Sequence, residues 1–585
     1  MNIIRELSED FEKVFETRGF DKSLAKVAFS ARPELCDFQL NAAFALAKQT
    51  GKNPMAIATE IANAATSPNY TVSVCPPAFV NITLSDKKLG EIANEILKDK
   101  QNGLEKTDSP KSILMDYGGA NVAKELHMGH LRSPIIGESL KRLYKLLGHK
   151  VVADSHLGDW GTQMGLTIAQ LEEDGCVEGY FGRGPKKPVT MEMLNTAYPK
   201  ASARKKVDAE FKAKADRYTL AVQHKEEPFF SIYKDIRALS VARIDANYKK
   251  LNCYFDLWYG ESDAAPFIDE TVQIFVDKNL AHESDGALVV DVAREGEHIP
   301  IPKKSPDEPQ LYKNPMPPCI IKKANDGDVY ATTDLATILM RNRMFELDEI
   351  EYVVDKRQST HFEQVFRCAK MSGISPENQK LLHIGYGTMN GKDGKPFKTR
   401  EGTTVKLEDI ISMLQNAAAE RLAQNGIEGN EKLALQIGVA AMKFGDLSNQ
   451  ISKDYVFDLD RFLSFEGKTG PFLQYTAARI KSLLSKADTK PGTVEICSQD
   501  EKNIVLAALK LLSSYAICYE EKSLASLTTA VYNLASAYST LYANTRILTE
   551  KDKTRKASLL ALSAFVLGQL EMALSVLGID VPDRM

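Results

Sequence analysis

Apolar residues recur at helical spacing from the start of the chain. Over 3–15 they fall on one face of a helix and predict an amphipathic first helix. A second helical pattern covers 39–48, and the alternation of apolar and polar residues over 72–84 predicts a strand. A polar stretch at 99–111 indicates a linker. We therefore predict a small α+β domain over residues 1–105.

The pattern changes after this linker. Residues 112–117 form a short apolar run that predicts a strand, a helical pattern continues to Leu146, and 151–153 predicts a second strand. A strand, a helix and a strand in this order form a βαβ unit, which begins a parallel, doubly wound sheet. Later strands of the same sheet are predicted at 351–354 and 381–386. The fold class is therefore α/β, with a Rossmann-like parallel sheet.

Two further segments complete the predicted domain organisation. Residues 165–320 are longer than a crossover connection needs, so we interpret them as an insertion in the sheet domain, which spans 106–435. From about residue 435 onward the strand pattern ends and long Ala- and Leu-rich helical patterns follow. We predict an all-α domain over 436–585.

Composition and charge exclude several classes of protein. The chain has 585 residues, 44% hydrophobic and 26% charged, which is ordinary for a folded protein and excludes a disordered or coiled-coil chain. Its formal net charge of −4 gives no global basic field for a nucleic acid or an anionic membrane. The 8 cysteines form no CxxC pair, which favours a reducing compartment, and the acidic N-terminus is unlike a signal peptide. The apolar stretch 557–579 contains Gln569 and Glu571, so we predict a buried helix, no membrane span and a cytoplasmic location.

The main candidate for chemistry lies between the first predicted strand of the sheet and its helix. His127 and His130 stand three residues apart at a helix start, where both can donate N–H bonds to a polyphosphate beside the unpaired amides of the helix. Gly129 between them leaves room for a purine ring. The alternative is a pair of surface histidines near a helix cap. A zinc site with His156 lacks further ligands at matching spacing, so no structural metal is predicted.

This HxGH motif and the sequence around it resemble a known family. HxGH after the first strand is the signature of class I aminoacyl-tRNA synthetases, and NVAKELHMGHLRSPIIGESL at 121–140 is similar to the arginyl-tRNA synthetase family. Further matches to that family occur in the same order along the chain, at 156–163, 260–262, 330–334, 358–362, 467–479 and 577–585. The resemblance therefore covers nearly the whole chain.

The resemblance implies a pocket for the arginine side chain. A guanidinium is planar and permanently charged, so its pocket needs carboxylates that can accept paired hydrogen bonds. Asp334 follows Tyr330 by four residues and would share its helical face. The residues that the family uses for arginine correspond here to Asn121, His127, Glu261, Tyr330, Asp334 and Gln358.

A second nucleotide signal lies in the glycine-rich segment 386–406, which carries five basic and two acidic side chains. It corresponds to the KMSK loop of class I synthetases, and we predict that Gly387 and Met389 contact ATP. The last lysine of that motif is replaced by Thr399. In the arginine branch a lysine just upstream of HxGH is thought to substitute, which implies Lys124. We predict catalytic roles for His127 and His130, with the charge on departing pyrophosphate neutralised by Lys124 and by Lys398 or Arg400.

Neither flanking domain has the excess of positive charge that is typical of an RNA-binding domain, so RNA recognition must depend on shape, stacking and local patches. In the N-terminal domain, which the family places against the tRNA elbow, Phe79 and Asn81 share a strand face and are candidates to stack on a base and to read its edge. In the helical domain, Tyr538, Tyr542 and the terminal Met585 are candidates for the anticodon surface. Core packing is the alternative for each aromatic residue.

The predicted function is ATP-dependent attachment of L-arginine to its tRNA through an arginyl-adenylate, with release of AMP and pyrophosphate. ATP enters with Mg²⁺ as a substrate complex. The resemblance implies attack by the 2′-hydroxyl of the terminal adenosine, and a requirement for bound tRNA before the adenylate forms. We expect a monomer. Two alternatives remain: a simple nucleotidyltransferase that does not need the flanking domains, and a silent paralogue that only binds tRNA or senses arginine.

Overall fold

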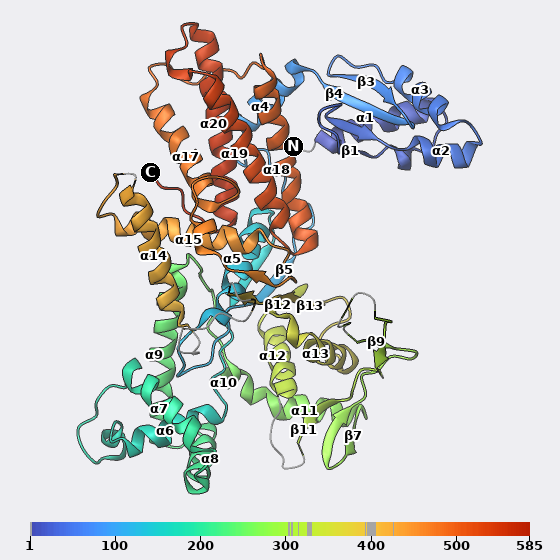
Figure 1. Ribbon diagram of the computed structural model, residues 1–585. Helices are drawn as coiled ribbons and strands as arrows, with labels where there is room; N and C mark the ends of the chain where they lie inside the picture. Colours follow the sequence, from blue (N-terminus) through green and yellow to red (C-terminus); the bar gives the residue numbers. More distant parts are fainter. Residues whose placement is uncertain are drawn as a thin grey trace. The chain divides into compact units, whose positions relative to one another are not determined.

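The computed structural model describes residues 3–301, 303, 305, 308–313, 315–323, 330–391, 394, 405–424 and 426–585. The chain divides into two compact units, coloured along the sequence in Figure 1. Unit 1 comprises 1–107, 432–448 and 460–585, and unit 2 comprises 108–431 and 449–459. The sequence interpretation placed every residue from 436 on in the helical domain. The structure assigns 449–459 to unit 2, because strand β15 (Tyr455–Val456) pairs in parallel with β14 (Met389–Asn390).

The N-terminal part of unit 1 is an antiparallel sheet with the strand order β1-β2-β4-β3, packed against helices. Helix α1 buries Ile3, Leu7, Phe11 and Phe15, which confirms the predicted amphipathic helix. The elements of this part are α1 (Ile3–Thr17), η1 (Lys22–Leu24), β1 (Val27–Phe29), β2 (Phe38–Leu40), α2 (Ala43–Thr50), α3 (Pro54–Ala64), β3 (Tyr70–Cys75), β4 (Phe79–Leu84) and α4 (Asp86–Lys98).

Two predictions in this part were wrong in detail. The single strand expected over 72–84 is a hairpin, because the chain turns between β3 and β4 at Pro76 and Pro77. The helix expected over 39–48 begins only at Ala43, because Phe38 and Leu40 both face the core from strand β2, which pairs with β1 and β4.

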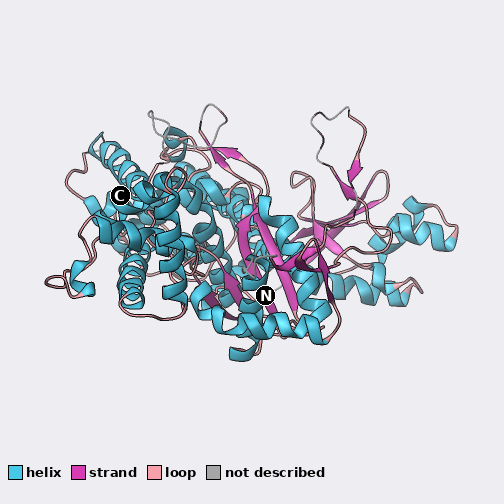
Figure 2. Ribbon diagram, turned by 90° about the horizontal axis from the view of Figure 1, so that it is seen from below, coloured by secondary structure: helices cyan, strands magenta, loops and turns pink. Residues whose placement is uncertain are grey.

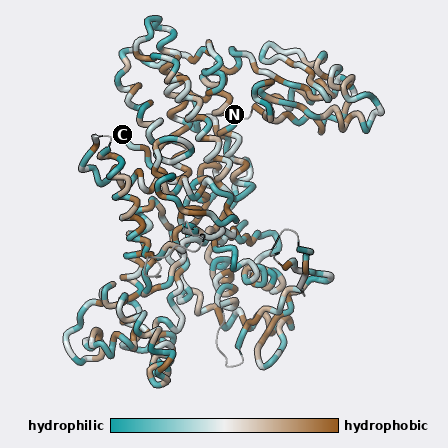
Figure 3. Tube along the Cα trace, in the orientation of Figure 1, coloured by the Kyte–Doolittle hydropathy of each residue, from teal (hydrophilic) through white to brown (hydrophobic). Residues whose placement is uncertain are grey.

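The C-terminal part of unit 1 is helical, and its helices carry both hydrophobic and hydrophilic residues (Figure 3). Helix α20 is long and apolar enough to cross a membrane by length and composition, but most of its apolar stretch is buried, chiefly against α17 and α19. The helices are α15 (Glu431–Leu447), α16 (Leu459–Phe462), α17 (Gly470–Lys486), α18 (Gln499–Glu521), α19 (Ala525–Asn544), η6 (Ile547–Thr549) and α20 (Lys553–Val576).

Unit 2 contains the parallel sheet that the sequence predicts, and Figure 2 shows its strands between helices. The strands are β5 (Ser112–Asp116), β6 (Lys150–Asp154), β12 (Glu349–Asp355) and β13 (Lys380–Tyr386), in the order β13-β12-β5-β6. After β5 the chain adds β6 on one side, and it later returns to add β12 on the other. The carboxyl ends of β5 and β12 therefore flank the switch point of the sheet, where open α/β folds bind ligands.

The segment between β6 and β12 contains a helical part and a small antiparallel sheet of order β11-β8-β7. Helices α12 and α13 pack against the parallel sheet through a hydrophobic cluster that includes Leu335, Ile350 and Val365. The other elements of unit 2 are η2 (Met128–His130), α5 (Arg132–Leu146), α6 (Thr162–Glu173), η3 (Glu178–Phe181), α7 (Met191–Arg204), α8 (Ala209–Gln223), α9 (Phe229–Lys250), α10 (Glu261–Ala264), η4 (Ala265–Phe267), α11 (Ile268–Asp277), β7 (Ala281–Ser284), β8 (Ala287–Val290), β9 (Ile299–Pro300), β10 (Tyr312–Lys313), β11 (Cys319–Lys322), α12 (Tyr330–Met344), η5 (Lys356–Gln358), α13 (Ser359–Ser372) and α14 (Leu407–Gln424).

Candidate active site

A cavity of about 600 Å³ opens at the switch point of the parallel sheet in unit 2. It is lined by the loops that follow β5 and β12 and by the first turns of α10, α12 and α13. Its polar lining includes most of the residues that the sequence predicts for arginine and ATP: Asn121, His127, Gly129, His130, Glu261, Tyr330, Asp334 and Gln358. Segments separated by more than two hundred residues thus meet at one edge of the sheet.

The two histidines of the HxGH motif cap the short helix η2 through their own ring nitrogens. His127 Nδ1 accepts a hydrogen bond from the Gly129 amide at 3.1 Å, and His130 Nδ1 accepts one from the His127 amide at 3.1 Å. Because each neutral ring then carries its proton on Nε2, both Nε2–H groups are hydrogen-bond donors. A side chain at Gly129 would place Cβ 2.9 Å from His127 Cε1, so glycine is needed for this arrangement.

Electrostatics keeps both imidazoles neutral. Burial lowers the pKa of His127, and the charge of Lys124 lowers it further. Burial also lowers the pKa of His130 to about 4, assisted by His127 and Lys124. The pair therefore presents neutral N–H donors to the cavity at neutral pH, and the ammonium of Lys124 is close enough to influence both rings.

Two carboxylates face the same cavity from different helices. Glu261 is the first residue of α10, and burial raises the pKa of its carboxyl, as do the charges of Asp159 and Asp334. Asp334 lies one turn into α12, which begins at Tyr330 as the spacing predicts, and its Oδ2 lies 2.5 Å from Nε2 of His361. Tyr330 is 79% exposed. Because Asp334 adds a negative charge near the buried carboxyl of Glu261, a cation bound between the two would be stabilised.

Asp159 fixes the helix that carries Glu261. Its buried carboxylate accepts hydrogen bonds from the Ser262 amide at 2.9 Å and from Arg237 Nε at 2.7 Å. A Cβ at Gly260 would lie 2.6 Å from Asp159 Oδ1, so only glycine allows this approach. Asp159 lies within the 156–163 match to the family, but the sequence alone gave no sign of this positioning role.

A buried ion cluster borders the cavity, whose lining includes Asp116 and His156. Arg341, on α12 two turns beyond Asp334, is fully buried, and its Nη2 lies 2.7 Å from both Asp116 Oδ2 and Asp154 Oδ2. His156 lies beside these carboxylates, and three such ligands together could hold a metal ion. The guanidinium balances one of the two carboxylate charges, and Asp154 and Asp116 raise the pKa of His156 although burial lowers it, so a divalent cation is disfavoured there. The cluster instead fixes α12 to the ends of β5 and β6, and sequence reasoning missed it.

Asn121 and Lys124 lie on the loop between β5 and η2. Asn121 lines the cavity, and its backbone forms a bridge with that of Gly158. A Cβ at Gly158 would lie 2.4 Å from Asn121 Oδ1, so the loop is closely packed here. The ammonium of Lys124 lies 4.7 Å from the ring centre of Tyr198 on α7.

Gly387 and Met389 are not among the described residues that line this cavity, and their contact with ATP stays a prediction. The Gly387 carbonyl accepts a hydrogen bond from Arg132 Nη1 at 2.6 Å, and a Cβ at Gly387 would lie 2.4 Å from the backbone of Lys453. Met389 is buried and pairs with Tyr455 in the β14–β15 ladder. Both residues are engaged by segment 451–456. Lys398 and Arg400, with the rest of the predicted loop motif, lie outside the described residues.

Two of the predicted tRNA contacts lie in the interior of unit 1. Asn81 is 5% exposed, and its Oδ1 accepts a hydrogen bond from Gln39 Nε2 at 3.0 Å. Tyr538 is fully buried and donates to Ser563 Oγ at 3.0 Å. These two predictions of an RNA-contacting surface were wrong, because both polar groups are satisfied inside the protein. The other three candidates, which are partly exposed and stay predictions, are Phe79, Tyr542 and Met585.

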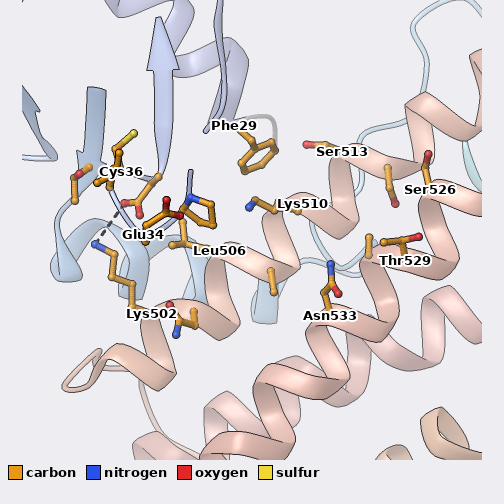
Figure 4. A pocket seen from close by; sticks show the side chains of 18 of the residues that line it. Phe29, Glu34, Cys36, Lys502, Leu506, Lys510, Ser513, Ser526, Thr529 and Asn533 are labelled. Atoms are coloured by element: carbon orange, nitrogen blue, oxygen red, sulfur yellow. Dashed lines mark ion pairs between the residues drawn. The ribbon is translucent and has the colours of Figure 1, made fainter. Parts of the chain in front are cut away.

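A larger cavity of about 1130 Å³ lies within unit 1, between the N-terminal sheet and helices α18 and α19 (Figure 4). Lys502 forms an ion pair with Asp37 at 3.4 Å, and Lys510 lies 5.6 Å from the ring centre of Phe29. With Glu34, the lining carries two cations and two anions. This balance gives the cavity no preference for a charged ligand.

Comparison with known proteins agrees with the fold and identifies the family. Residues 91–459 match the family described as tRNA synthetases class I (R), catalytic domain; residues 473–585 match the DALR anticodon binding domain, and residues 1–84 the arginyl tRNA synthetase N terminal domain. The parallel sheet with HxGH after its first strand is therefore the catalytic core of a class I aminoacyl-tRNA synthetase.

The full length of the chain identifies its branch within this class. Curated arginine–tRNA ligases from Agathobacter rectalis and Alkaliphilus oremlandii are 41% and 40% identical, and each match covers 100% of both chains. The chain belongs to the arginine–tRNA ligase family, whose reaction attaches arginine to its tRNA. The arginyl-tRNA synthetase structures from Thermus thermophilus (22% identity, TM-score 0.78, 100% of both chains) and Plasmodium falciparum (21% identity, TM-score 0.79, 100% of this chain and 99% of that one) share the fold.

Proposed function

We propose that the cavity at the switch point is where arginine and ATP react. The observation that carries this proposal is the juxtaposition of two neutral Nε2–H donors and two carboxylates in one cavity. The donors suit the oxygen atoms of a polyphosphate. The carboxylates of Glu261 and Asp334 suit the five N–H groups of a guanidinium.

The first step needs no general base. The carboxylate of arginine is ionised at neutral pH, and it attacks the α-phosphorus of ATP as pyrophosphate leaves from the opposite side. The catalytic contribution of His127 and His130 is therefore to position the phosphates and to donate hydrogen bonds to oxygens that gain charge. Magnesium enters bound to ATP, as phosphate chemistry requires. Asn121 and His127 contact the amino-acid end of the substrate, and Gln358 lies beside the pocket.

Lys124 supplies positive charge beside the histidines, in place of the lysine that Thr399 replaces in the loop motif. This role is supported by the position of Lys124, which is close enough to both imidazoles for its charge to lower their pKa. In the second step the 2′-hydroxyl of the terminal adenosine attacks the activated carbonyl, and bound tRNA is required before the adenylate forms. Phe79, Tyr542 and Met585 contribute to tRNA contact. The proposed protein is a monomer in the cytoplasm. Its eight free thiols fit a reducing compartment of that kind.

Arginine-dependent exchange of pyrophosphate into ATP, measured with and without tRNA, tests this assignment. Asp334→Asn should raise the KM for arginine at least tenfold and leave the KM for ATP unchanged, because it removes one charged partner of the guanidinium. His130→Ala should lower kcat by about 100-fold. Asp269→Asn, on the exposed face of α11, is the matched control and should behave as the parent. An unchanged KM for arginine in Asp334→Asn would refute the pocket.

A further inference from the structure

His361 contacts the carboxylate of Asp334 directly inside the cavity. Its Nε2 lies 2.5 Å from Asp334 Oδ2, and the two side chains are 30% and 29% exposed. They come from neighbouring helices, α13 and α12, and both line the cavity. Oδ2 of Asp334 therefore contacts the imidazole, and Oδ1 takes no part in this contact.

We propose that His361 is a positioning residue for the guanidinium pocket and that it exchanges its charge for that of the substrate. It holds Oδ2 of Asp334, so that Oδ1 is directed to the guanidinium, and it provides the positive charge that balances Asp334 before arginine binds. Arginine binding then displaces one proton from His361: one N–H bond of the imidazolium breaks, its electron pair stays on nitrogen, the proton passes to solvent, and no other covalent bond changes. This inference rests on the proposed role of Asp334 as an arginine contact.

The groups around His361 support this exchange. The hydrogen bond to Asp334 raises the pKa of His361 although burial lowers it, and the charges of Asp334 and Cys319 on β11 raise it as well. On β13, His383 is close enough to His361 for their charges to interact, and its own pKa is lowered, chiefly by burial, so it stays neutral.

The charges of η5, the fourth element packed against α13, are engaged elsewhere. Lys356 pairs with Asp454 at 2.9 Å, and Arg357 pairs with Asp355 at 2.6 Å. The imidazolium of His361 is thus the cation in direct contact with Asp334 among the described residues of these elements.

The sign of the expected pH dependence follows from this arrangement. A guanidinium beside Asp334 adds a positive charge near His361 and disfavours its protonated form. Because the proton must leave, arginine binds more tightly as the pH rises through the raised pKa of His361 in the free enzyme. Above that pKa the affinity becomes independent of pH, up to the range where the α-amino group of arginine titrates.

Calorimetric titration of the full-length enzyme with L-arginine between pH 6 and 8 tests this inference, in two buffers of different ionisation enthalpy. The parent should release a fraction of a proton that increases as the pH falls below neutrality, and its Kd should rise about tenfold from pH 8 to pH 6. His361→Gln keeps an N–H donor but cannot titrate. It should bind arginine within about threefold of the parent at pH 8, with no proton release and no pH dependence.

Two further variants separate the possible outcomes. His361→Ala loses both the donor and the charge and should bind about tenfold more weakly at pH 8, whereas the matched control His383→Gln should keep the proton release of the parent. If His361→Gln still releases protons as the parent does, the inference is overturned. If Asp334→Asn binds arginine as the parent does, the proposed pocket itself is wrong, which is a different failure.

Discussion

Replacing Arg341 by methionine should destabilise unit 2 by about 3–5 kcal/mol. The guanidinium is fully buried and bonds to Asp116 and Asp154 at 2.7 Å each. Each charge-assisted hydrogen bond contributes about 1.5–3 kcal/mol, and methionine, although similar in volume, replaces neither. Two carboxylates would then remain buried near each other without the guanidinium that bonds both, with His156 as the titratable group beside them, so the uptake of a proton by one carboxyl would be favoured.

Scanning calorimetry of the full-length protein measures this effect. The two units can unfold separately, so the transition of unit 2 is followed by the loss of arginine-dependent pyrophosphate exchange after heating. The expected decrease in its midpoint is on the order of 5–10 °C. The exchange activity itself should also fall, because α12 carries both Arg341 and Asp334.

A matched control separates lost charge balance from lost packing. The triple variant Asp116→Asn, Asp154→Asn, Arg341→Met removes all three charges together, and it should recover more than half of the lost midpoint. A single Arg341→Met variant that melts within 1 °C of the parent would refute the reasoning. So would a triple variant as unstable as the single one.

Three further changes have defined outcomes. Lys124→Met should lower kcat for arginine activation about 100-fold with an unchanged melting midpoint, and parental exchange rates would contradict its proposed role. Tyr538→Phe should cost about 1 kcal/mol in chemical denaturation with an unchanged Kd for tRNA, whereas a weaker Kd without lost stability would return Tyr538 to the RNA surface. Gly137→Ala should cost about 1–3 kcal/mol in the same assay, because its Cβ would lie 2.2 Å from Tyr117 Cγ, and a neutral result would mean that the ring moves aside.

The acid dependence of stability follows from His130. Burial lowers its pKa to about 4, so the folded state favours the neutral ring. The contribution of the neutral ring to stability is complete above pH 6.5, the ordinary pKa of histidine, and is lost as the pH falls from there toward 4. Denaturation of His130→Gln should therefore show a smaller loss of stability between pH 6.5 and 4 than that of the parent. An identical loss would show that the ring is protonated in the folded protein.

The parallel sheet could be predicted because its strands are short apolar runs bounded by turn residues. Residues 113–116 and 349–353 are buried on both faces, and each strand contains a short apolar run, at 113–115 and at 352–354. The hairpin at 70–84 could not be separated from one strand, because alternation continues across the turn. Nor could the core position of Tyr538 be predicted, since a stripe of tyrosines does not show which face of a helix is covered.

Local spacing predicted the parts of the candidate site whose residues are neighbours in sequence, and the family resemblance supplied Asn121, Glu261 and Gln358. His127 and His130 share one turn, and Asp334 follows Tyr330 on one helix, so local spacing was sufficient. The contact of His361 with Asp334 spans 27 residues, and that of Arg341 with Asp116 spans 225. The packing of Gly387 against Lys453 is also distant in sequence, and only the folded chain shows it.

The structure of the enzyme in complex with L-arginine and a non-hydrolysable ATP analogue tests the central claim most directly. The account predicts the guanidinium within hydrogen-bond distance of both Glu261 and Asp334. It also predicts Nε2 of His127 and His130 directed at phosphate oxygens. A guanidinium bound away from these carboxylates, or a triphosphate that contacts neither imidazole, would contradict it.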